Sequence, residues 1–301
     1  MVVILGPTGV GKSAAGVHLA QRFGGEIINC DSMQVYRGFD IGTDKPRPEM
    51  RKLVPHHLLD IASPEDQFTA ADFVRQALVA IGQIEEKGKL PIVVGGTGLY
   101  LKALVDGLFP GPGRNIELRR RLEHEAAEKG LLSLRRKLEE VDPAYARLIG
   151  ERDKVRIIRA LEVFSLTKQP ISRHFQNTRS ELASFHVSKI GLQLERKVLY
   201  RRIEDRVDAM FRMGIVAEVR GLLAAGVKET APPFHALGYK HVLAHIKGHI
   251  SLDEAARLTK RDTRHYAKRQ ITWFRKMQGV NWLPAEDYAA QAAFLEAELA
   301  D

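Results

Sequence analysis

The stretch Gly6-Pro-Thr-Gly-Val-Gly-Lys-Ser13 decides the fold of the first domain, because it follows an apolar strand and precedes a helical stretch. It fits the pattern G-x-x-x-x-G-K-[ST], and Val2–Leu5 provides the strand that the pattern requires before it. Glycines let consecutive backbone N–H groups point at phosphate oxygens, and the helix that begins near Ser13 adds its positive end. The loop therefore predicts a site for a di- or triphosphate and does not by itself indicate ATP. Lys12 can neutralise the terminal phosphate, and Ser13 can ligate Mg²⁺. The residues predicted to bind the phosphates are Gly6, Thr8, Gly9, Val10, Gly11, Lys12 and Ser13.

Composition restricts the classes of protein to which the chain can belong. Its 301 residues suffice for one large or two modest domains, and 45% of them are hydrophobic, as in globular proteins. No apolar run approaches the roughly 20 residues that span a bilayer, and Cys30 is the only cysteine, which excludes an intrachain disulfide. We therefore expect a cytoplasmic monomer without a membrane segment. The net charge of +9 (46 basic minus 37 acidic residues) indicates a polyanionic partner, because basic surfaces attract phosphate backbones.

Apolar strands alternate with helices in the first third of the chain. Glu26–Asn29 and Leu90–Val94 are typical of buried strands, and Thr69–Lys87 has apolar residues at helical spacing. This alternation predicts an α/β fold with a P-loop-type parallel sheet flanked by helices. Ligands of such sheets bind beyond the carboxyl ends of the strands. The phosphate loop, Asp31 and Thr97 each follow a strand, so we expect them to share one crevice.

A change in composition marks a second domain. Gly107–Asn115 is rich in Pro and Gly, as linkers are, and the chain from there to about Thr178 is helical in pattern and rich in charge. Strand and helix patterns then resume, at His186–Leu194, Arg196–Ala225, Ser251–Lys276 and Val280–Leu283. We therefore predict a P-loop α/β core domain made of residues 1–113 and 181–301, with an all-helical insertion domain, residues 114–180.

One acidic residue common in nucleotide hydrolases is missing. In those enzymes a strand such as Leu90–Val94 commonly ends in Asp, which holds Mg²⁺ or orients water. Here the strand runs into Gly-Gly-Thr, and the acid at a comparable strand end is Asp31. A kinase could use Asp31 to deprotonate a substrate hydroxyl, so an ATP-dependent small-molecule kinase stays open on motif grounds.

Basic residues form one face of the long C-terminal helix. They lie in two rows spaced by four residues, Arg257, Arg261, His265 and Arg269 beside Lys260, Arg264 and Lys268. Within this basic face only Asp262 offsets the charge, and Trp273 and Phe274 follow. The pattern favours contact with RNA or pyrophosphate. The alternative is a solvated helix, and for Trp273 and Phe274 themselves packing in the core is the favoured interpretation.

Two further arginine groups are candidates for anion contacts. Arg201, Arg202 and Arg206 lie on one helix and could serve the diphosphate. Arg156 and Arg159 lie on a helix of the insertion, where they could contact RNA. An i,i+3 surface pair between Arg159 and Glu162 is an equally good interpretation of that second group.

Taken together, these motifs resemble those of the tRNA dimethylallyltransferase (tRNA isopentenyltransferase) family over nearly the whole chain. The motifs are GPTGVGKS (6–13), DSMQVYRGFDIGT (31–43), PHHLLDI (55–61), FTAADF (68–73), VGGTGLYLKAL (94–104), RIIRALEVF (156–164), ALGYK (236–240) and AKRQITWFR (267–275). The resemblance implies transfer of a dimethylallyl group from dimethylallyl diphosphate to the exocyclic N6 of the adenosine 3′-adjacent to the tRNA anticodon. It also implies release of pyrophosphate, use of Mg²⁺ and binding of the anticodon stem-loop, with the insertion as a tRNA-binding lid.

The resemblance also implies roles for individual residues. Asp31 corresponds to the general base that accepts a proton from N6, while Thr97 and Lys12 complete the catalytic set. Departing pyrophosphate needs electrostatic stabilisation, for which Arg202 and Arg206 are the candidates beside the loop. The implied tRNA-contacting residues are Asp31, Ser32, Met33, Gln34, Thr97, Arg119, Arg156, Arg159, Gly238, Tyr239, Lys240, Lys268, Arg269, Gln270, Trp273 and Arg275. A non-catalytic RNA-binding protein is the third hypothesis, and it leaves the phosphate loop unexplained.

Overall fold

The computed structural model describes residues 1–109 and 111–300, which fall into two compact units. The first unit combines Met1–Val105 with the chain from Ser184 onward, and the second is Asp106–Ala183. The predicted insertion, residues 114–180, lies inside the second unit. The predicted linker Gly107–Asn115 includes residue 110, which is outside the described residues.

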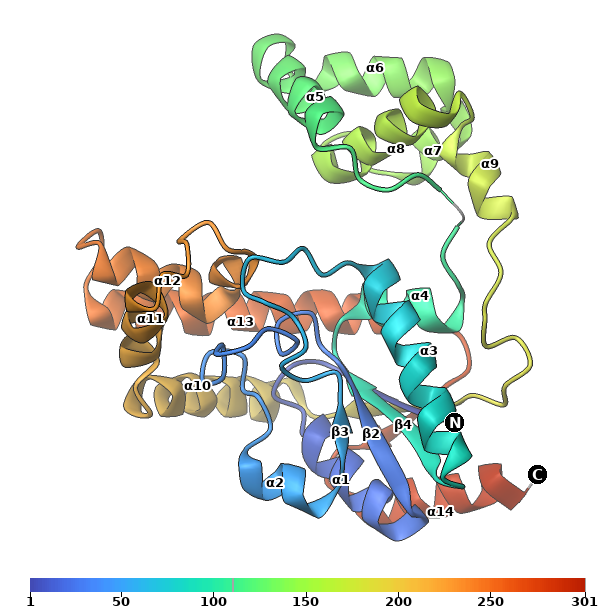
Figure 1. Cartoon of the computed structure of the whole chain (residues 1–301), viewed down its shortest axis with the longest axis vertical. Helices are drawn as coiled ribbons and strands as arrows, with labels where there is room; N and C mark the ends of the chain where they lie inside the picture. Colours follow the sequence, from blue (N-terminus) through green and yellow to red (C-terminus); the bar gives the residue numbers. More distant parts are fainter. Residues whose placement is uncertain (110, 301) are drawn as a thin grey trace. The chain divides into compact units, whose positions relative to one another are not determined.

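A single parallel sheet forms the centre of the first unit (Figure 1). Among the described residues its six strands have the order β3-β2-β4-β1-β5-β6, and every pairing is parallel. This confirms the predicted α/β class. The short strand β3 was not predicted, because two residues are too few to show an apolar pattern. The strands are β1 (Val2–Leu5), β2 (Gly25–Cys30), β3 (His56–His57), β4 (Leu90–Gly95), β5 (Ser188–Gln193) and β6 (Val280–Pro284).

Helices cover both faces of the sheet, as the apolar runs of the central strands require. Val2 and Ile4 face a core that also contains apolar residues of α1, α10 and α14. Because side chains alternate along a strand, Val3 and Leu5 face the opposite side, and α3 contacts β2 and β4 as well as α4. The helices of this unit are α1 (Lys12–Phe23), α2 (Pro48–Leu53), α3 (Ala70–Glu86), α4 (Gly98–Val105), α10 (Arg196–Arg212), α11 (Ile215–Ala224), η1 (Pro232–His235), α12 (Leu237–Ile246), α13 (Leu252–Phe274) and α14 (Tyr288–Ala300).

Local sequence explains where two of these helices begin or end. Ser251 caps α13, since its hydroxyl accepts a hydrogen bond of 3.1 Å from the Glu254 N–H, as the S-x-x-E pattern predicts. The helical region expected over Arg196–Ala225 is two helices, because Gly214 adopts a φ of +95° between α10 and α11. A left-handed residue interrupts the right-handed helix, and glycine adopts this conformation without a Cβ clash.

The second unit is all-helical and has its own apolar core. Buried residues of this core include Leu134, Leu138, Ile157 and Leu161. Its helices are α5 (Ile116–Lys129), α6 (Leu131–Val141), α7 (Pro143–Leu148), α8 (Lys154–Thr167) and α9 (Ile171–Gln176).

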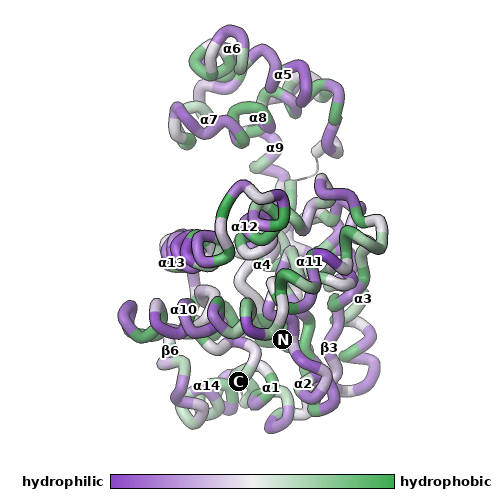
Figure 2. The backbone as a smooth tube through the Cα atoms, turned by 90° about the vertical axis from the view of Figure 1, so that its left-hand side faces the viewer, coloured by the Kyte–Doolittle hydropathy of each residue, from purple (hydrophilic) through white to green (hydrophobic). Residues whose placement is uncertain are grey.

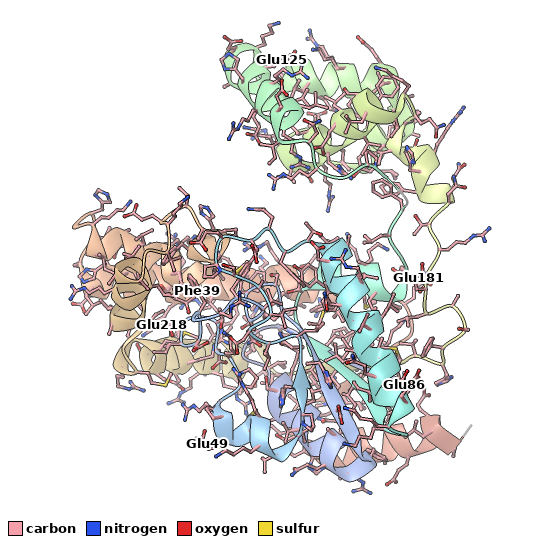
Figure 3. The ribbon with its side chains drawn as sticks, viewed as in Figure 1. Phe39, Glu49, Glu86, Glu125, Glu181 and Glu218 are labelled. Atoms are coloured by element: carbon pink, nitrogen blue, oxygen red, sulfur yellow. The ribbon has the colours of Figure 1, made fainter. Side chains whose placement is uncertain are left out.

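An aromatic cluster joins α11 and α12 to the segment after β2. The rings of Phe39 and Tyr239 meet edge to face with centroids 4.9 Å apart, and Phe234 packs edge-on against Phe39 at 5.1 Å. Glu218, which lies close to Phe39 in Figure 3, accepts hydrogen bonds from the Tyr239 hydroxyl (2.5 Å) and the Ile41 N–H (2.8 Å). The cluster therefore fixes the segment that carries the DSMQVY motif.

A buried carboxylate at the start of β2 makes stability sensitive to acid. Glu26 is 1% exposed and accepts hydrogen bonds from Lys89 (2.8 Å), Lys87 (3.1 Å) and His57 Nε2 (2.8 Å). Burial of Glu26 opposes its ionisation, but these three donors outweigh that effect and lower its pKa to about 2. A lowered folded-state pKa stabilises the fold above the unfolded value of 4.5, and the benefit is lost as the pH falls toward about 2.

We expect Glu26→Gln to lower the free energy of unfolding by about 2 kcal/mol at neutral pH, because a neutral amide pairs less strongly with the lysines. The variant should also lose less stability than the wild type between pH 4.5 and 2. Chemical denaturation at several pH values measures both effects, and Glu86→Gln, on the exposed end of α3 (Figure 3), is the control. If the wild type and Glu26→Gln lost the same amount of stability in acid, protonation of Glu26 would not be a cause of that loss.

Candidate active site

A cavity of about 630 Å³ lies at the carboxyl ends of the strands in the first unit. It is lined by the phosphate loop, the ends of β2 and β4, and residues of α10, α12 and α13. The structure thus gathers residues that are up to 261 positions apart into the one crevice expected from the sequence. The predicted site residues that line it are Thr8, Gly9, Gly11, Lys12, Ser13, Asp31, Ser32, Met33, Gln34, Arg202, Arg206, Gly238 and Arg269.

Glycine is required at two positions of the phosphate loop. Gly9 has a φ of +80°, and a Cβ added there would lie 2.9 Å from the Ile203 side chain of α10. Gly11 has a φ of +107° and precedes the first residue of α1. The loop therefore turns directly into the helix, so backbone N–H groups and the positive helix end face the same cavity.

Lys12 contributes a cation whose charge is sensitive to its surroundings. Its Nζ donates to the Pro7 carbonyl at 2.9 Å within the loop. Burial lowers the pKa of Lys12 to about 8, the negative charge of Asp31 opposes this effect, and the positive charge of Arg206 adds to it. An anion bound beside Nζ would favour the protonated form.

Two arginines of α10 line the same cavity, each held by an acid. Arg206 donates to the Thr8 hydroxyl (2.7 Å) and pairs with Asp44 (3.0 Å). Its Nε is buried and meets no acceptor among the described residues. Arg202 pairs with Glu286, which lies between β6 and α14. Both guanidinium groups are therefore placed for a diphosphate, and Arg206 has an N–H available for it.

Asp31 begins a tight turn after β2. Its Oδ1 accepts hydrogen bonds from the Met33 N–H (2.8 Å) and the Gln34 N–H (3.3 Å). Within the described part of the chain these contacts use Oδ1 and leave Oδ2 for another partner. Thr97 was expected in the same crevice as Asp31 but does not line the cavity, because its hydroxyl accepts from the Ser32 N–H at 3.1 Å. Thr97 thus joins the turn after β4 to the turn that carries Asp31.

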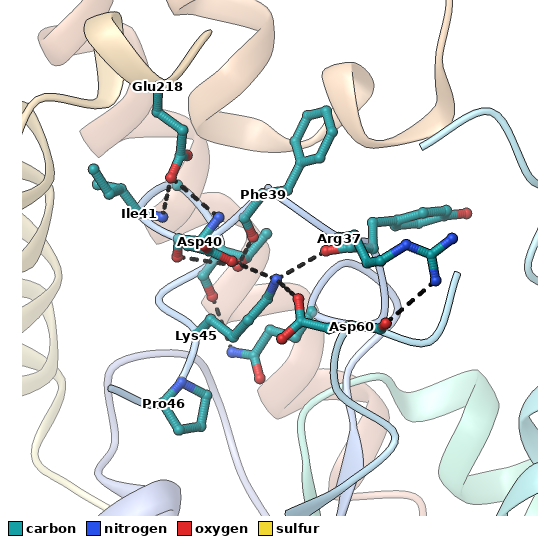
Figure 4. Close-up of polar contacts among 12 residues, drawn as sticks. Arg37, Phe39, Asp40, Ile41, Lys45, Pro46, Asp60 and Glu218 are labelled. Carbon is teal, nitrogen blue, oxygen red and sulfur yellow. Dashed lines mark hydrogen bonds and ion pairs between the residues drawn. The ribbon is translucent and has the colours of Figure 1, made fainter. Parts of the chain in front are cut away.

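The segment after this turn is built around a buried lysine (Figure 4). Lys45 Nζ donates to the Tyr36 carbonyl (2.8 Å), to Asp40 (2.5 Å) and to Asp60 (2.6 Å), and its side chain is 1% exposed. Gln34 donates to the carbonyls of Thr43 (3.0 Å) and Asp44 (3.1 Å). These contacts hold Asp44 where it meets Arg206.

Gln270 and Tyr239 are two of the residues predicted to contact tRNA. Both side chains are buried, and Tyr239 is fully enclosed in the aromatic cluster. Gln270 accepts from the Thr8 N–H (2.8 Å) and donates to the Gly96 carbonyl (2.7 Å). Because both side chains are buried and hydrogen-bonded internally, this structure gives no support for a direct contact with tRNA, and that role stays a prediction.

The aromatic pair at the end of α13 packs as favoured from the sequence, at least in part. Phe274 is fully buried. Trp273 is half-buried, and a Cβ added to Gly98 would lie 2.5 Å from its indole ring. Gly98, the first residue of α4, thus allows the close approach of α13.

The basic face of α13 has more acidic partners than the sequence suggests. Lys260 pairs with Asp208 and Arg264 with Glu204, both from α10, while Arg257 pairs with Glu254. Asp262 accepts from Lys240, His241 and Arg261. In the described structure the exposed residues Lys268 and Arg275 have no acidic partner, and Arg269, also exposed, lies over the Tyr266 ring at 5.7 Å. The hydrophilic character of α13 is plain in Figure 2.

The arginines of the second unit converge on one buried acid. Glu162 is fully buried and accepts from Arg119 (3.0 Å), Arg159 (2.7 Å) and the Asn115 N–H (2.7 Å). The Arg159–Glu162 pair is therefore an internal contact and not the surface pair considered from the sequence. Arg156 is exposed and pairs with Asp153 at 3.5 Å.

Several residues of the cavity were not singled out from the sequence. Asn29, Asp44, Met210, His235 and Tyr266 all line it. Burial raises the pKa of Tyr266, with a further contribution from the charge of Asp31. Tyr266 lies three residues before Arg269 on the same helix, so the sequence could have placed the two on one face. The other four residues lie on segments for which the sequence offered no motif.

Within the residues described, no group of three or more His, Cys, Asp and Glu side chains is arranged to hold a metal ion. No helix in the same residues is long and apolar enough to cross a membrane.

Comparisons with known proteins agree with the geometry of this site. The family model described as IPP transferase matches residues 34–277. The chain is 51% identical over 283 residues to a tRNA dimethylallyltransferase of Geobacter metallireducens, covering 94% of this chain and 92% of the relative. A second relative with that name, from Geobacter sulfurreducens, is 50% identical over 94% of this chain and 91% of its own length.

Solved structures are similar over almost the whole chain. The tRNA isopentenylpyrophosphate transferase of Bacillus halodurans matches with a TM-score of 0.74 and 39% identity, covering 99% of this chain and 96% of its own. A eukaryotic dimethylallyltransferase acting on tRNA matches with a TM-score of 0.81 and 29% identity, covering 99% of this chain and 77% of its own. The phosphate loop, the Asp31 turn and these similarities lead to one conclusion: the chain belongs to the IPP transferase family.

Proposed function

We propose that the chain transfers a dimethylallyl group from dimethylallyl diphosphate to N6 of the adenosine 3′-adjacent to the tRNA anticodon, releasing pyrophosphate. The observation that carries the proposal is the content of one cavity. It is lined by the phosphate loop with Lys12, by Arg202 and Arg206 of α10, and by Asp31. A leaving group and a base in one cavity suit a displacement at carbon. The lining residues all belong to the first unit of a single chain, which supports an active monomer.

The phosphate loop would hold the diphosphate and stabilise it as it leaves. Lys12, Arg202 and Arg206 face the cavity together with the N-terminus of α1. As the allylic C–O bond breaks, negative charge grows on the bridging oxygen and is shared by the diphosphate. The two arginines would exchange Asp44 and Glu286 for phosphate oxygens, and the buried Nε of Arg206 gains an acceptor.

The residues present fit a magnesium ion that is bound mainly through the diphosphate. Ser13, which is exposed, and Asp44 both line the cavity, and their side chains carry the oxygen ligands that Mg²⁺ prefers. Because the described residues offer no cluster of three acidic or histidine ligands, phosphate and water oxygens would complete the shell. When bound, the ion would add positive charge next to the departing pyrophosphate.

Asp31 would accept the proton from the adenine amine. The N6 lone pair is delocalised into the ring, so N6 becomes nucleophilic only as its proton leaves. Asp31 lines the cavity, and its Oδ1 is held by two backbone N–H groups, so Oδ2 would be the atom that takes the proton. Ser32 and Met33 line the cavity next to Asp31, where they could contact the base. Reaching N6 in an anticodon loop requires flipping the base out of its stack, at a cost of a few kcal/mol.

Exposed cations near the cavity would bind the RNA backbone. The exposed residues are Lys268 and Arg269 of α13, Arg275 directly after that helix, and Lys240 of α12. Arg156 is the exposed arginine of α8 in the second unit, whereas Arg119 and Arg159 would act there by holding the helices around Glu162.

A small-molecule kinase is the alternative that the phosphate loop alone would allow. Membership of the IPP transferase family favours prenyl transfer, and the cationic α13 surface beside the cavity would have no role in phosphorylation of a small alcohol. A protein that only binds RNA would leave the phosphate loop and its arginines without a ligand.

Incubation with unmodified tRNA, dimethylallyl diphosphate and Mg²⁺, followed by nucleoside mass analysis, tests the proposal. The expected product is an adenosine that carries a dimethylallyl group, found only at the position 3′ of the anticodon, with one pyrophosphate released per group transferred. Parallel reactions with ATP in place of the diphosphate should leave the tRNA unchanged. Consumption of ATP with no prenylated nucleoside would support the kinase instead.

A further inference from the structure

Gln270 is a buried polar residue that joins the two halves of the cavity. It lies on α13 and is 6% exposed. Its Oε1 accepts from the Thr8 N–H at 2.8 Å, 262 residues away in the chain, and its Nε2 donates to the Gly96 carbonyl at 2.7 Å. Thr8 belongs to the phosphate loop, whereas Gly96 lies in the turn after β4.

The turn after β4 is hydrogen-bonded to the turn that carries Asp31. Thr97 follows Gly96, and its hydroxyl accepts from the Ser32 N–H at 3.1 Å. Ser32 is the residue after Asp31, whose carboxylate holds the same turn. Three hydrogen bonds and the peptide bond between Gly96 and Thr97 therefore connect Thr8, through Gln270, to the turn of Asp31.

The packing around this amide is close. A Cβ added to Gly96 would lie 2.5 Å from Gln270 Nε2 and 3.4 Å from Lys12 Nζ, so a side chain at Gly96 would displace the amide. Thr8 is held from a second direction as well, because Arg206 donates to its hydroxyl at 2.7 Å. Arg206 of α10 thus holds the hydroxyl of Thr8, and Gln270 of α13 holds its N–H.

We propose that Gln270 is a positioning residue that sets the separation between the diphosphate and the base side of the cavity, so that the allylic carbon and N6 meet in line. This inference rests on the proposed function. Gln270 does not line the cavity, so its effect would be exerted through Thr8 and the Gly96–Thr97 turn. Displacement reactions lose about 100-fold in rate for a misplacement on the order of 1 Å, so a positioning residue is expected to affect kcat most.

The test compares Gln270→Met with Gln291→Met under identical conditions. Methionine is similar in volume to glutamine and cannot make the two hydrogen bonds. Gln291 is a matched control, since it is also a buried glutamine, and it donates to the carbonyls of Pro284 and Ala285 outside the cavity. For both variants, kcat, KM for dimethylallyl diphosphate, Kd for tRNA and the unfolding midpoint are measured.

We expect Gln270→Met to lower kcat by about 100-fold with the Kd for tRNA within about threefold of wild type. Gln291→Met should lose stability and keep kcat within about threefold, because a structural defect alone does not misalign the reactants. A Gln270→Met enzyme with wild-type kcat, or a tRNA Kd weakened in proportion to kcat, would overturn the inference. The latter result would restore a direct tRNA contact.

Gln270→Glu provides a second readout in case the methionine variant does not fold. The carboxylate retains an acceptor for the Thr8 N–H and loses the donor to the Gly96 carbonyl. We expect kcat to fall by at least tenfold while the Kd for pyrophosphate stays within threefold, and an unchanged kcat would contradict the inference. An inactive wild type would instead contradict the proposed function, so the two failures are distinguishable.

Discussion

Asp31→Asn is expected to reduce the rate of dimethylallyl transfer by about 100- to 10,000-fold, the contribution typical of a positioned general base. The amide oxygen of asparagine can still accept from the Met33 and Gln34 N–H groups, so the turn after β2 should persist. What the variant loses is the ability to accept a proton. The Kd for tRNA should therefore change by less than about threefold, and single-turnover kinetics with saturating tRNA measures the chemical step.

Asp66→Asn is the matched control for this experiment. Asp66 is exposed, and its carboxylate also accepts a backbone N–H, that of Ser63 at 2.8 Å, in a turn outside the cavity. Its substitution should leave transfer unchanged. Asp31→Ala should be more damaging than Asp31→Asn, because it removes the turn as well. Transfer by Asp31→Asn within tenfold of the wild-type rate would remove Asp31 from the proton transfer.

Lys12→Met should weaken binding of dimethylallyl diphosphate by about 10- to 100-fold, as expected for the loss of one charge-assisted contact of 1.5–3 kcal/mol. The wild type should show a pH dependence that the variant lacks. Burial lowers the pKa of Lys12 to about 8, so free Lys12 loses its proton above that pH. Binding then requires proton uptake, and the Kd should rise by up to about tenfold per pH unit above about 8.

Isothermal titration of the diphosphate at several pH values measures this dependence. Below about pH 8 the wild-type Kd should be constant, because Lys12 is already protonated. Lys137→Met, which removes an exposed lysine paired with Glu125 in the second unit (Figure 3), should behave as the wild type. A Kd for Lys12→Met that still rises with pH would assign the dependence to another group.

Features encoded by short segments were predictable from the sequence. The phosphate loop, the apolar strands around it and the capped start of α13 each depend on residues within a few positions of one another. The placement of Asp31 and the phosphate loop in one crevice followed from a general property of parallel sheets.

Features that depend on distant partners were not predictable. The sequence motif around Gln270 is basic and predicts contact with RNA. Gln270 is instead buried, and it accepts a hydrogen bond from Thr8, which lies 262 residues away in the chain. The acids that offset the charge of α13 come from α10, 52 and 60 residues earlier. Glu162 in the second unit likewise gathers Arg119 from another helix, which i,i+3 spacing alone could not show.

The order of strands in the sheet has a consequence for how the protein is made. β1 lies between β4 and β5, and β5 follows the entire second unit in the chain. During synthesis one edge of β1 thus stays unpaired until the chain has been made as far as β5, about 190 residues later. Thr8 waits longer still for Gln270. Such long-range pairing is slow to form, so the nascent chain completes the surroundings of its phosphate loop only after α13 has been made.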